Sequence, residues 1–86
     1  MRILIPSQLR SYTQGAGQVE GAGETLATIL VNLDAAYPGL RFRIIDELGR
    51  IRPHIRIFVA REQVRSLDVR IQPQDEIQIV GALSGG

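Results

Sequence analysis

Apolar and polar residues alternate at the start of this 86-residue chain and then change to a helical spacing. The alternation over Arg2–Pro6 predicts a first strand, and Pro6 removes one backbone donor at its end. The polar stretch Ser7–Gly17 predicts a turn or loop. A short second strand is expected at Gln18–Glu20, so the chain opens with a hairpin.

One amphipathic helix is expected after this hairpin. Thr25 can cap it, because a threonine hydroxyl accepts a hydrogen bond from an amide of the first turn. Pro38 and Gly39 end it. The apolar residues between them recur at i, i+3, i+4, i+7 and i+11, which defines one side of a helix. We assign this stripe to the core: Leu26, Ile29, Leu30, Leu33 and Tyr37.

The second half of the chain predicts further strands. Leu40–Pro53 has no clear period, which favours irregular structure with a short strand or one turn of helix. His54–Ala60 alternates, and its β-branched residues predict a central strand. A tight turn is expected at Arg61–Gln63, followed by a brief strand near Val64 and Arg65.

The last strand is expected at Glu76–Val80, after a turn at Gln72–Asp75 that has proline in its second position. The order of strands and helix predicts an α+β domain of two layers, with one main helix packed on a sheet. We expect one domain over residues 1–80 and a flexible tail over residues 81–86. The first and last strands should lie side by side at the centre of the sheet.

Composition excludes several kinds of chemistry. The chain has no cysteine and a single histidine, His54, which excludes disulfides, a cysteine nucleophile, a cysteine-ligated zinc site and a two-histidine metal motif. All ten basic residues are arginine, so the chain offers no lysine amine to an isopeptide bond. We therefore expect no metal and, in any conjugation, the role of donor.

Charge and hydropathy narrow the partners. The net charge of +1 does not favour nucleic-acid binding. No apolar run approaches the ~20 residues that span a bilayer, and the apolar start is too short for a signal peptide. We expect no membrane association and a cytoplasmic location.

Gly85 and Gly86 end the sequence in a carboxylate that carries no neighbouring side chains. At an average glycine usage of roughly 7%, such a pair occurs at a given place in about one chain in 200. Chain ends are more often inert than reactive. Glycine can, however, adopt backbone angles closed to other residues and thread a narrow channel in a partner. The terminus is therefore the candidate reactive group.

Two other features suggest contacts with a partner. Arg50, Arg52, His54 and Arg56 are spaced by two, which places them on one side of an extended chain. They predict either a docking face for an acidic partner, through Arg52 and Arg56, or the solvated face of a one-sided sheet. Leu83 is either an anchor against a partner or a residue that folds back onto the sheet edge.

Several short motifs occur in a characteristic order along essentially the whole chain. They are Ile5-Pro6, Leu9-Arg10, Gly23-Glu24-Thr25-Leu26, Tyr37-Pro38-Gly39, Phe58-Val59, Asp75-Glu76-Ile77 and Gly85-Gly86. In this order they resemble the ubiquitin-like sulfur carrier proteins with the β-grasp fold. That family includes the thiamine-pathway carrier, the small subunit of molybdopterin synthase and a carrier used for cysteine synthesis. The opening Ile5-Pro6 with Leu9-Arg10 and Thr13, and the long connection over residues 43–52, look most like the cysteine-synthesis branch.

The sequence departs from the family pattern at two places. Ala60 and Arg61 stand where the family usually has asparagine or aspartate with glycine, and Gly81 or Ala82 stands where a proline is common. These departures concern the hairpin turn and the stiffness of the tail.

The resemblance implies a mixed sheet of four to five strands on one main helix, and a carrier that is not an enzyme. It implies that an ATP-dependent, E1-like enzyme adenylates the Gly86 carboxylate, and that a sulfur donor then converts it to a thiocarboxylate. Ser84 and Gly85 would thread the tail into the partner. A sulfur-accepting synthase would take the sulfur, with cysteine or a related metabolite as the expected product, while thiamine, molybdopterin, a thiolated natural product and tRNA stay open. ATP would be used by the partner, and no cofactor would be bound.

Two alternatives remain from the sequence. The same activated terminus could be joined to lysines of target proteins, as in a ubiquitin-like modifier. The domain could also be a β-grasp interaction module with an inert tail.

Overall fold

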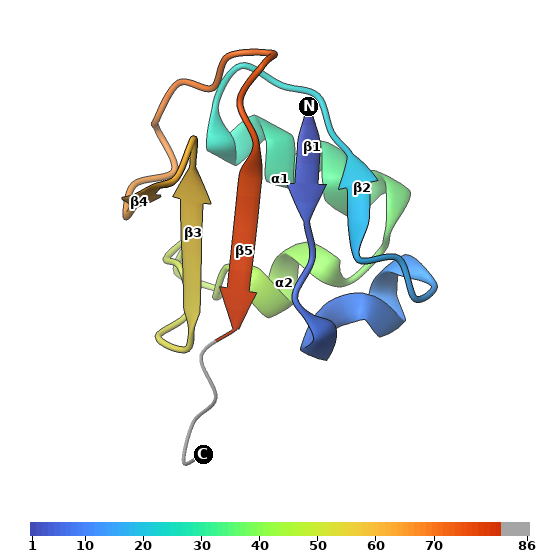
Figure 1. Ribbon diagram of the computed structural model, residues 1–86. Helices are drawn as coiled ribbons and strands as arrows, with labels where there is room; N and C mark the ends of the chain where they lie inside the picture. The colour runs from blue at the N-terminus through green and yellow to red at the C-terminus, as the bar shows by residue number, and fades with distance from the viewer. Residues whose placement is uncertain (82–86) are drawn as a thin grey trace.

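The computed structural model describes residues 1–81, which form a five-stranded sheet with helices on one face (Figure 1). The strand order is β2-β1-β5-β3-β4. The strands are β1 (Arg2–Leu4), β2 (Gln18–Glu20), β3 (Ile55–Val59), β4 (Glu62–Val64) and β5 (Ile77–Gly81). The pairing of β1 with β5 is parallel, and the other three pairings are antiparallel. This mixed sheet confirms the expected β-grasp fold.

The first and last strands lie side by side at the centre, as expected. Ile3 of β1 is in register with Ile77 of β5, and Ile57 of β3 is in register with Ile79 on the other side of β5. Ile3, Ile57 and Ile77 are fully buried and Ile79 is almost so. Alternate residues of the three inner strands therefore form the floor of the core.

The helix α1 (Leu26–Ala36) covers this floor. Thr25 caps it as predicted, because its Oγ1 accepts a hydrogen bond from the Thr28 amide at 3.2 Å. The first four residues of the predicted stripe are buried. Tyr37, the fifth, follows the last helical residue and is only partly buried against the core. The part of the stripe that lies within α1 therefore belongs to the core, as predicted.

Two segments without a clear period contain short helices. Ser7–Gly17, predicted as a turn or loop, contains the 3-10 helix η1 (Ser7–Thr13), which buries Leu9 and Thr13. The Thr13 hydroxyl donates a hydrogen bond to the Ala16 carbonyl at 2.8 Å, so its burial leaves no unpaired donor.

Leu40–Pro53 contains the expected turn of helix, α2 (Leu40–Ile44), which buries its first and last residues. Ile45 then bridges to Ile51, so that residues 46–50 form a closed loop. Gly49 has φ of 78°, a left-handed conformation that glycine adopts without strain.

The β3–β4 turn differs from the prediction. The sequence pattern predicts it at Arg61–Gln63, whereas the family resemblance places it at Ala60 and Arg61. Val59 pairs directly with Glu62, so Ala60 and Arg61 alone form the turn, as the resemblance implies, and β4 starts earlier than predicted. Both residues have positive φ, 51° and 74°. A two-residue turn with positive φ at both positions continues the right-handed twist of the two strands. A turn over residues 61–63 would break the pairing of Val59 with Glu62.

Other strand limits shift by one or two residues: β1 ends at Leu4 rather than Pro6, and β5 begins at Ile77 rather than Glu76. The central strand is shorter than His54–Ala60 at both ends, and β5 extends to Gly81 where the sequence predicted an end at Val80. Within residues 1–81, no helix combines the length and the apolar character needed to cross a membrane.

Candidate functional site

The predicted reactive end follows directly after β5. Leu83, Ser84, Gly85 and Gly86 lie outside the described residues, so the described part of the site is the end of β5 at Gly81. This strand is paired on both sides, with β1 and with β3, and Gly81 itself is in register with Ile55 of β3. The predicted reactive end is therefore attached to a central strand of the core.

A side chain from η1 contacts the end of β5. Gln8 Nε2 donates a hydrogen bond to the Gly81 carbonyl oxygen at 3.1 Å. No pattern in the sequence indicates this contact, since Gln8 lies in a stretch predicted as a loop and is 73 residues away from Gly81. Only the parallel alignment of β1 with β5 brings the two together.

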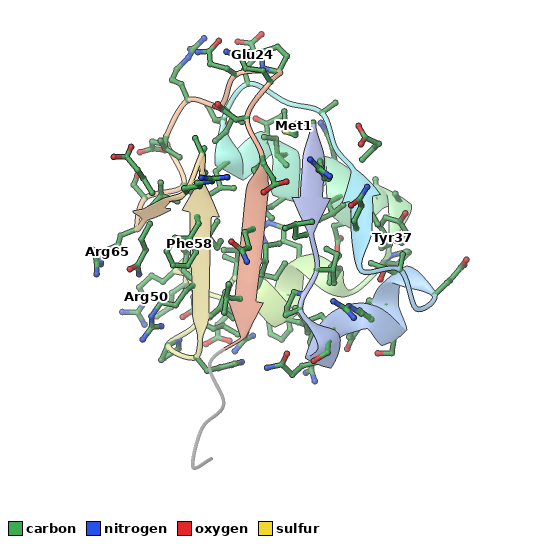
Figure 2. All side chains as sticks on the ribbon, in the orientation of Figure 1. Met1, Glu24, Tyr37, Arg50, Phe58 and Arg65 are labelled. Atoms are coloured by element: carbon green, nitrogen blue, oxygen red, sulfur yellow. The ribbon has the colours of Figure 1, made fainter. Side chains whose placement is uncertain are left out.

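An arginine-lined groove lies on the other side of β5, at the β3 and β4 edge of the sheet. We call it the arginine groove. Its volume is about 800 Å³ and its arginines are Arg50, Arg52, Arg56 and Arg65. Ile51, Ile55, Val64 and Leu67 supply apolar lining, and Asp68 is the acidic member of the lining. Figure 2 shows Arg50 and Arg65 on the same flank of the molecule, beside β3 and β4.

The arginine groove only partly matches the predicted basic stripe. It brings together Arg50, Arg52 and Arg56 of the stripe, whereas His54 is not part of the lining. Arg65 joins them from the end of β4, a neighbour that the spacing along one segment could not reveal.

Two of these arginines are held in place by nearby carbonyl groups. Arg52 Nε donates to the Phe42 carbonyl oxygen at 2.7 Å, and the Arg52 guanidinium lies 4.5 Å from the centre of the Phe42 ring. Arg56 Nη1 donates to the carbonyl oxygens of Pro53, at 2.6 Å, and Ile55, at 3.1 Å. A guanidinium has five N–H donors, so both arginines keep further donors for an anionic group.

Asp46 shapes the loop that carries Arg50. The backbone amides of Arg50 and Leu48 each donate to Asp46 Oδ1 at 2.9 Å, and Arg50 Nε lies 3.6 Å from Oδ2. The hydrogen bond from the Arg50 amide, followed by that from Leu48, lowers the pKa of Asp46 below its ordinary value of 3.8. The carboxylate therefore stays ionised and fixes this loop at neutral pH.

No group of three or more potential ligand side chains among residues 1–81 is placed to hold a metal ion.

Comparisons with known proteins cover almost the whole chain. The model of the ThiS family matches residues 3–86. The sulfur carrier protein CysO of Mycobacterium tuberculosis (strain ATCC 25618 / H37Rv) is 33% identical over 89 residues, which cover 98% of this chain and 96% of that protein.

Two solved structures are also similar. A chain of the Amycolatopsis orientalis BexX/CysO complex superposes with a TM-score of 0.92 and 28% identity, and the match covers 99% of this chain and 98% of that one. The small archaeal modifier protein 1 of Methanosarcina acetivorans superposes with a TM-score of 0.80 and 26% identity over 99% of this chain and 94% of that one.

Proposed function

The chain belongs to the ThiS family and is a sulfur carrier protein of the ThiS and CysO type, and on this premise we propose that it carries sulfur as a thiocarboxylate at Gly86. A carrier of this type is not an enzyme, so the catalytic groups belong to its partners. The fold contributes the attachment and the direction of the reactive end.

The proposed reaction has two steps. A carboxylate is a poor electrophile, so the Gly86 carboxylate first attacks the α-phosphorus of ATP, which releases pyrophosphate and forms an acyl adenylate. Hydrosulfide delivered by a sulfur donor then attacks the acyl carbon; the new C–S bond replaces the C–O bond to AMP, and AMP and a proton leave. A sulfur-accepting synthase afterwards takes the sulfur from the thiocarboxylate; the C–S bond breaks and water supplies the oxygen that restores the Gly86 carboxylate.

The observation that carries this proposal is the position of β5. Five residues follow Gly81, and five residues of extended chain reach at most ~17 Å. An activating enzyme must therefore bring its ATP site close to the folded body, which requires a docking surface near the end of β5. Ser84 and Gly85 are proposed to pass through the channel to that site, because glycine and a small side chain need little room.

The arginine groove lies where such a docking surface is needed. Two of its lining residues, Ile55 and Arg56, are in register with Gly81 and Val80 at the end of β5. We propose that Arg52 and Arg56 contact acidic residues of the E1-like activating enzyme there. Leu83 is proposed as the apolar anchor of the same contact. The A. orientalis relative occurs in a complex with BexX, which supports a protein partner.

Intact-mass spectrometry tests the proposal. The chain is incubated with MgATP, its activating enzyme and sulfide. We expect a mass gain equal to the replacement of one oxygen by sulfur, and no gain without ATP or after deletion of Gly86. An unchanged mass in the presence of an enzyme that is active on another carrier would refute the proposal.

One alternative function has support of its own. The likeness to the M. acetivorans modifier favours conjugation of Gly86 to lysines of target proteins. Lysine-linked adducts in cell extract that disappear when Gly86 is deleted would favour the modifier. If that deletion changes neither sulfur transfer nor adducts, the domain is an interaction module with an inert tail.

The pathway and the location are part of the same proposal. The 33% sequence identity to the M. tuberculosis carrier named CysO supports cysteine, or a related sulfur metabolite, as the product. We propose a cytoplasmic location because the activating step consumes ATP. Growth of a deletion strain with and without cysteine tests the product.

A further inference from the structure

Gly81, the last residue of β5, is held by a side chain that is remote in sequence. Gln8 Nε2 donates to the Gly81 carbonyl oxygen at 3.1 Å, and Gln8 Oε1 accepts a hydrogen bond from the Ser7 hydroxyl at 3.4 Å. The side-chain amide thus donates through nitrogen and accepts through oxygen, which fits one orientation of the group. We call the contact between Gln8 and Gly81 the tail clamp.

The fold explains why Gln8 lies beside Gly81. Neighbouring parallel strands run in the same direction, so the C-terminal ends of β1 and β5 lie next to each other. The chain leaves β1 through Pro6 and forms η1 at once, and Figure 1 shows η1 beside this end of β5. Leu9 and Thr13 bury the inner side of η1. Gln8 is therefore attached to an anchored element.

The residue type at position 81 matches this contact. The φ of Gly81 lies outside the left-handed region, so the backbone alone does not require glycine there. A Cβ at this position would lie 2.8 Å from Gln8 Cδ and 3.1 Å from Gln8 Oε1, and nearest of all to Gln8 Nε2. All of these atoms belong to the Gln8 amide. Glycine at position 81 is what allows that amide to approach the backbone.

We propose that Gln8 is a positioning residue for the sulfur-carrying end. A peptide unit is planar, so a hydrogen bond to the Gly81 carbonyl also fixes the plane in which the chain continues to residue 82. The clamp thereby sets the direction from which Gly86 approaches the partner. This inference rests on the proposed function and adds to it a residue outside the tail.

Two events precede adenylation: the folded body docks on the activating enzyme, and the tail then enters the ATP site. The folded body docks on the activating enzyme, and the clamp determines how often a docked chain presents Gly86 to ATP in a productive geometry. Loss of the clamp should therefore lower kcat of adenylation and leave KM for the chain nearly unchanged.

Four variants of the full 86-residue chain test this inference. Gln8→Ala removes the donor. Gly81→Ala displaces the Gln8 amide while keeping its chemistry, and the displaced group is the flexible end of an exposed side chain, so the fold is retained. The third variant combines both changes. Gln74→Ala is the matched control, because Gln74 is an exposed glutamine in the loop before β5, remote from its end.

Pyrophosphate release is measured with MgATP, the activating enzyme and sulfide, at several concentrations of each chain. Each single variant should lower kcat about three- to tenfold, the effect of one hydrogen bond, with KM within about twofold of wild type. The double variant should match the single variants, since both remove the same contact. Gln74→Ala should behave as wild type.

The inference is overturned if either single variant keeps the wild-type kcat, or if the two effects multiply in the double variant. A nuclear magnetic resonance readout is independent of activity: the Gln8 side-chain amide signal should shift in Gly81→Ala and not in Gln74→Ala. If wild type itself gains no sulfur, the proposed function fails, even where this signal confirms the clamp. If wild type is active and the signal does not shift, the clamp alone is refuted.

Discussion

Backbone strain in the β3–β4 turn can be released by substitution. Ala60 and Arg61 have φ of 51° and 74°, a region that costs a residue with a Cβ roughly 1–2 kcal/mol. Val59 and Glu62 pair directly, so these two residues cannot relax without a change in strand register. Turns of this geometry strongly favour Asn-Gly, and this chain has Ala-Arg in their place.

The size of the effect follows from two opposing terms. Arg61→Gly removes a strain of roughly 1–2 kcal/mol but adds about 0.5–1 kcal/mol of backbone entropy to the unfolded chain. The net stabilisation should be about 0.5–1 kcal/mol. Ala60→Asn should add a similar amount, because asparagine tolerates the left-handed region. Together they should raise the Tm by about 4–15 °C for a domain of this size.

Thermal and urea unfolding followed by circular dichroism measure this gain. Arg61→Ala is the matched control: it removes the same charge but keeps a Cβ at positive φ, so it should give no gain. Gly49→Ala should lose about 1 kcal/mol, because Gly49 has φ of 78° and open space around it, which leaves backbone strain as the main effect. If Arg61→Gly is no more stable than Arg61→Ala, the turn stores no strain and the reasoning is wrong.

Three further predictions concern the groove, its loop and the helix. The hydrogen bonds that lower the pKa of Asp46 stabilise the fold while its carboxylate is ionised. This stabilisation is present above the unfolded pKa of about 3.8 and is lost as the pH falls through the lower folded pKa. Asp46→Asn should therefore have a smaller free energy of unfolding than wild type at pH 7 in urea titrations, and this difference should narrow as the pH falls through the folded pKa. The double variant Arg52→Glu with Arg56→Glu should raise KM of adenylation about three- to tenfold at low salt and by a smaller factor at high salt. Arg61→Glu, outside the groove, should leave KM unchanged; an equal rise in KM for Arg61→Glu and for the double variant would contradict a local docking surface. Thr25→Ala should cost about 1 kcal/mol of unfolding free energy by loss of the cap, and no loss in denaturant titration would show that the cap is dispensable.

The sequence predicted those parts of the fold in which many residues repeat one pattern. Apolar residues recur every three or four positions in the α1 stripe and at every second position in the central strand, and these spacings are typical of one buried face of a helix and of a strand. By contrast, α2 has five residues, too few for a helical period, and η1 is a 3-10 helix with three residues per turn, which a search for the 3.6-residue period does not detect. The residue pattern misplaces the turn at Ala60 and Arg61, which the family resemblance locates correctly, because neither residue is typical of turns and strand pairing imposes their conformation.

The site was predictable only where it depends on one segment. The spacing of Arg50, Arg52 and Arg56 is visible in the sequence, and the structure places all three in one groove. Arg65 joins them through the β3–β4 pairing, and Gln8 meets Gly81 through the parallel pairing of β1 with β5. Contacts of this kind depend on register between distant strands, which no local pattern encodes.

The central place of β5 also bears on how a carrier passes from one partner to the next. Two strands separate β5 from each outer edge of the sheet: β1 and β2 on one side, β3 and β4 on the other. With strands about 4.8 Å apart, both edges lie roughly 10 Å from the point where the tail begins. An activating enzyme at one edge and an acceptor at the other would each lie at nearly the same distance from Gly81, where β5 ends. Two partners can therefore dock on opposite flanks, because Gly81 lies midway between the outer edges of the sheet.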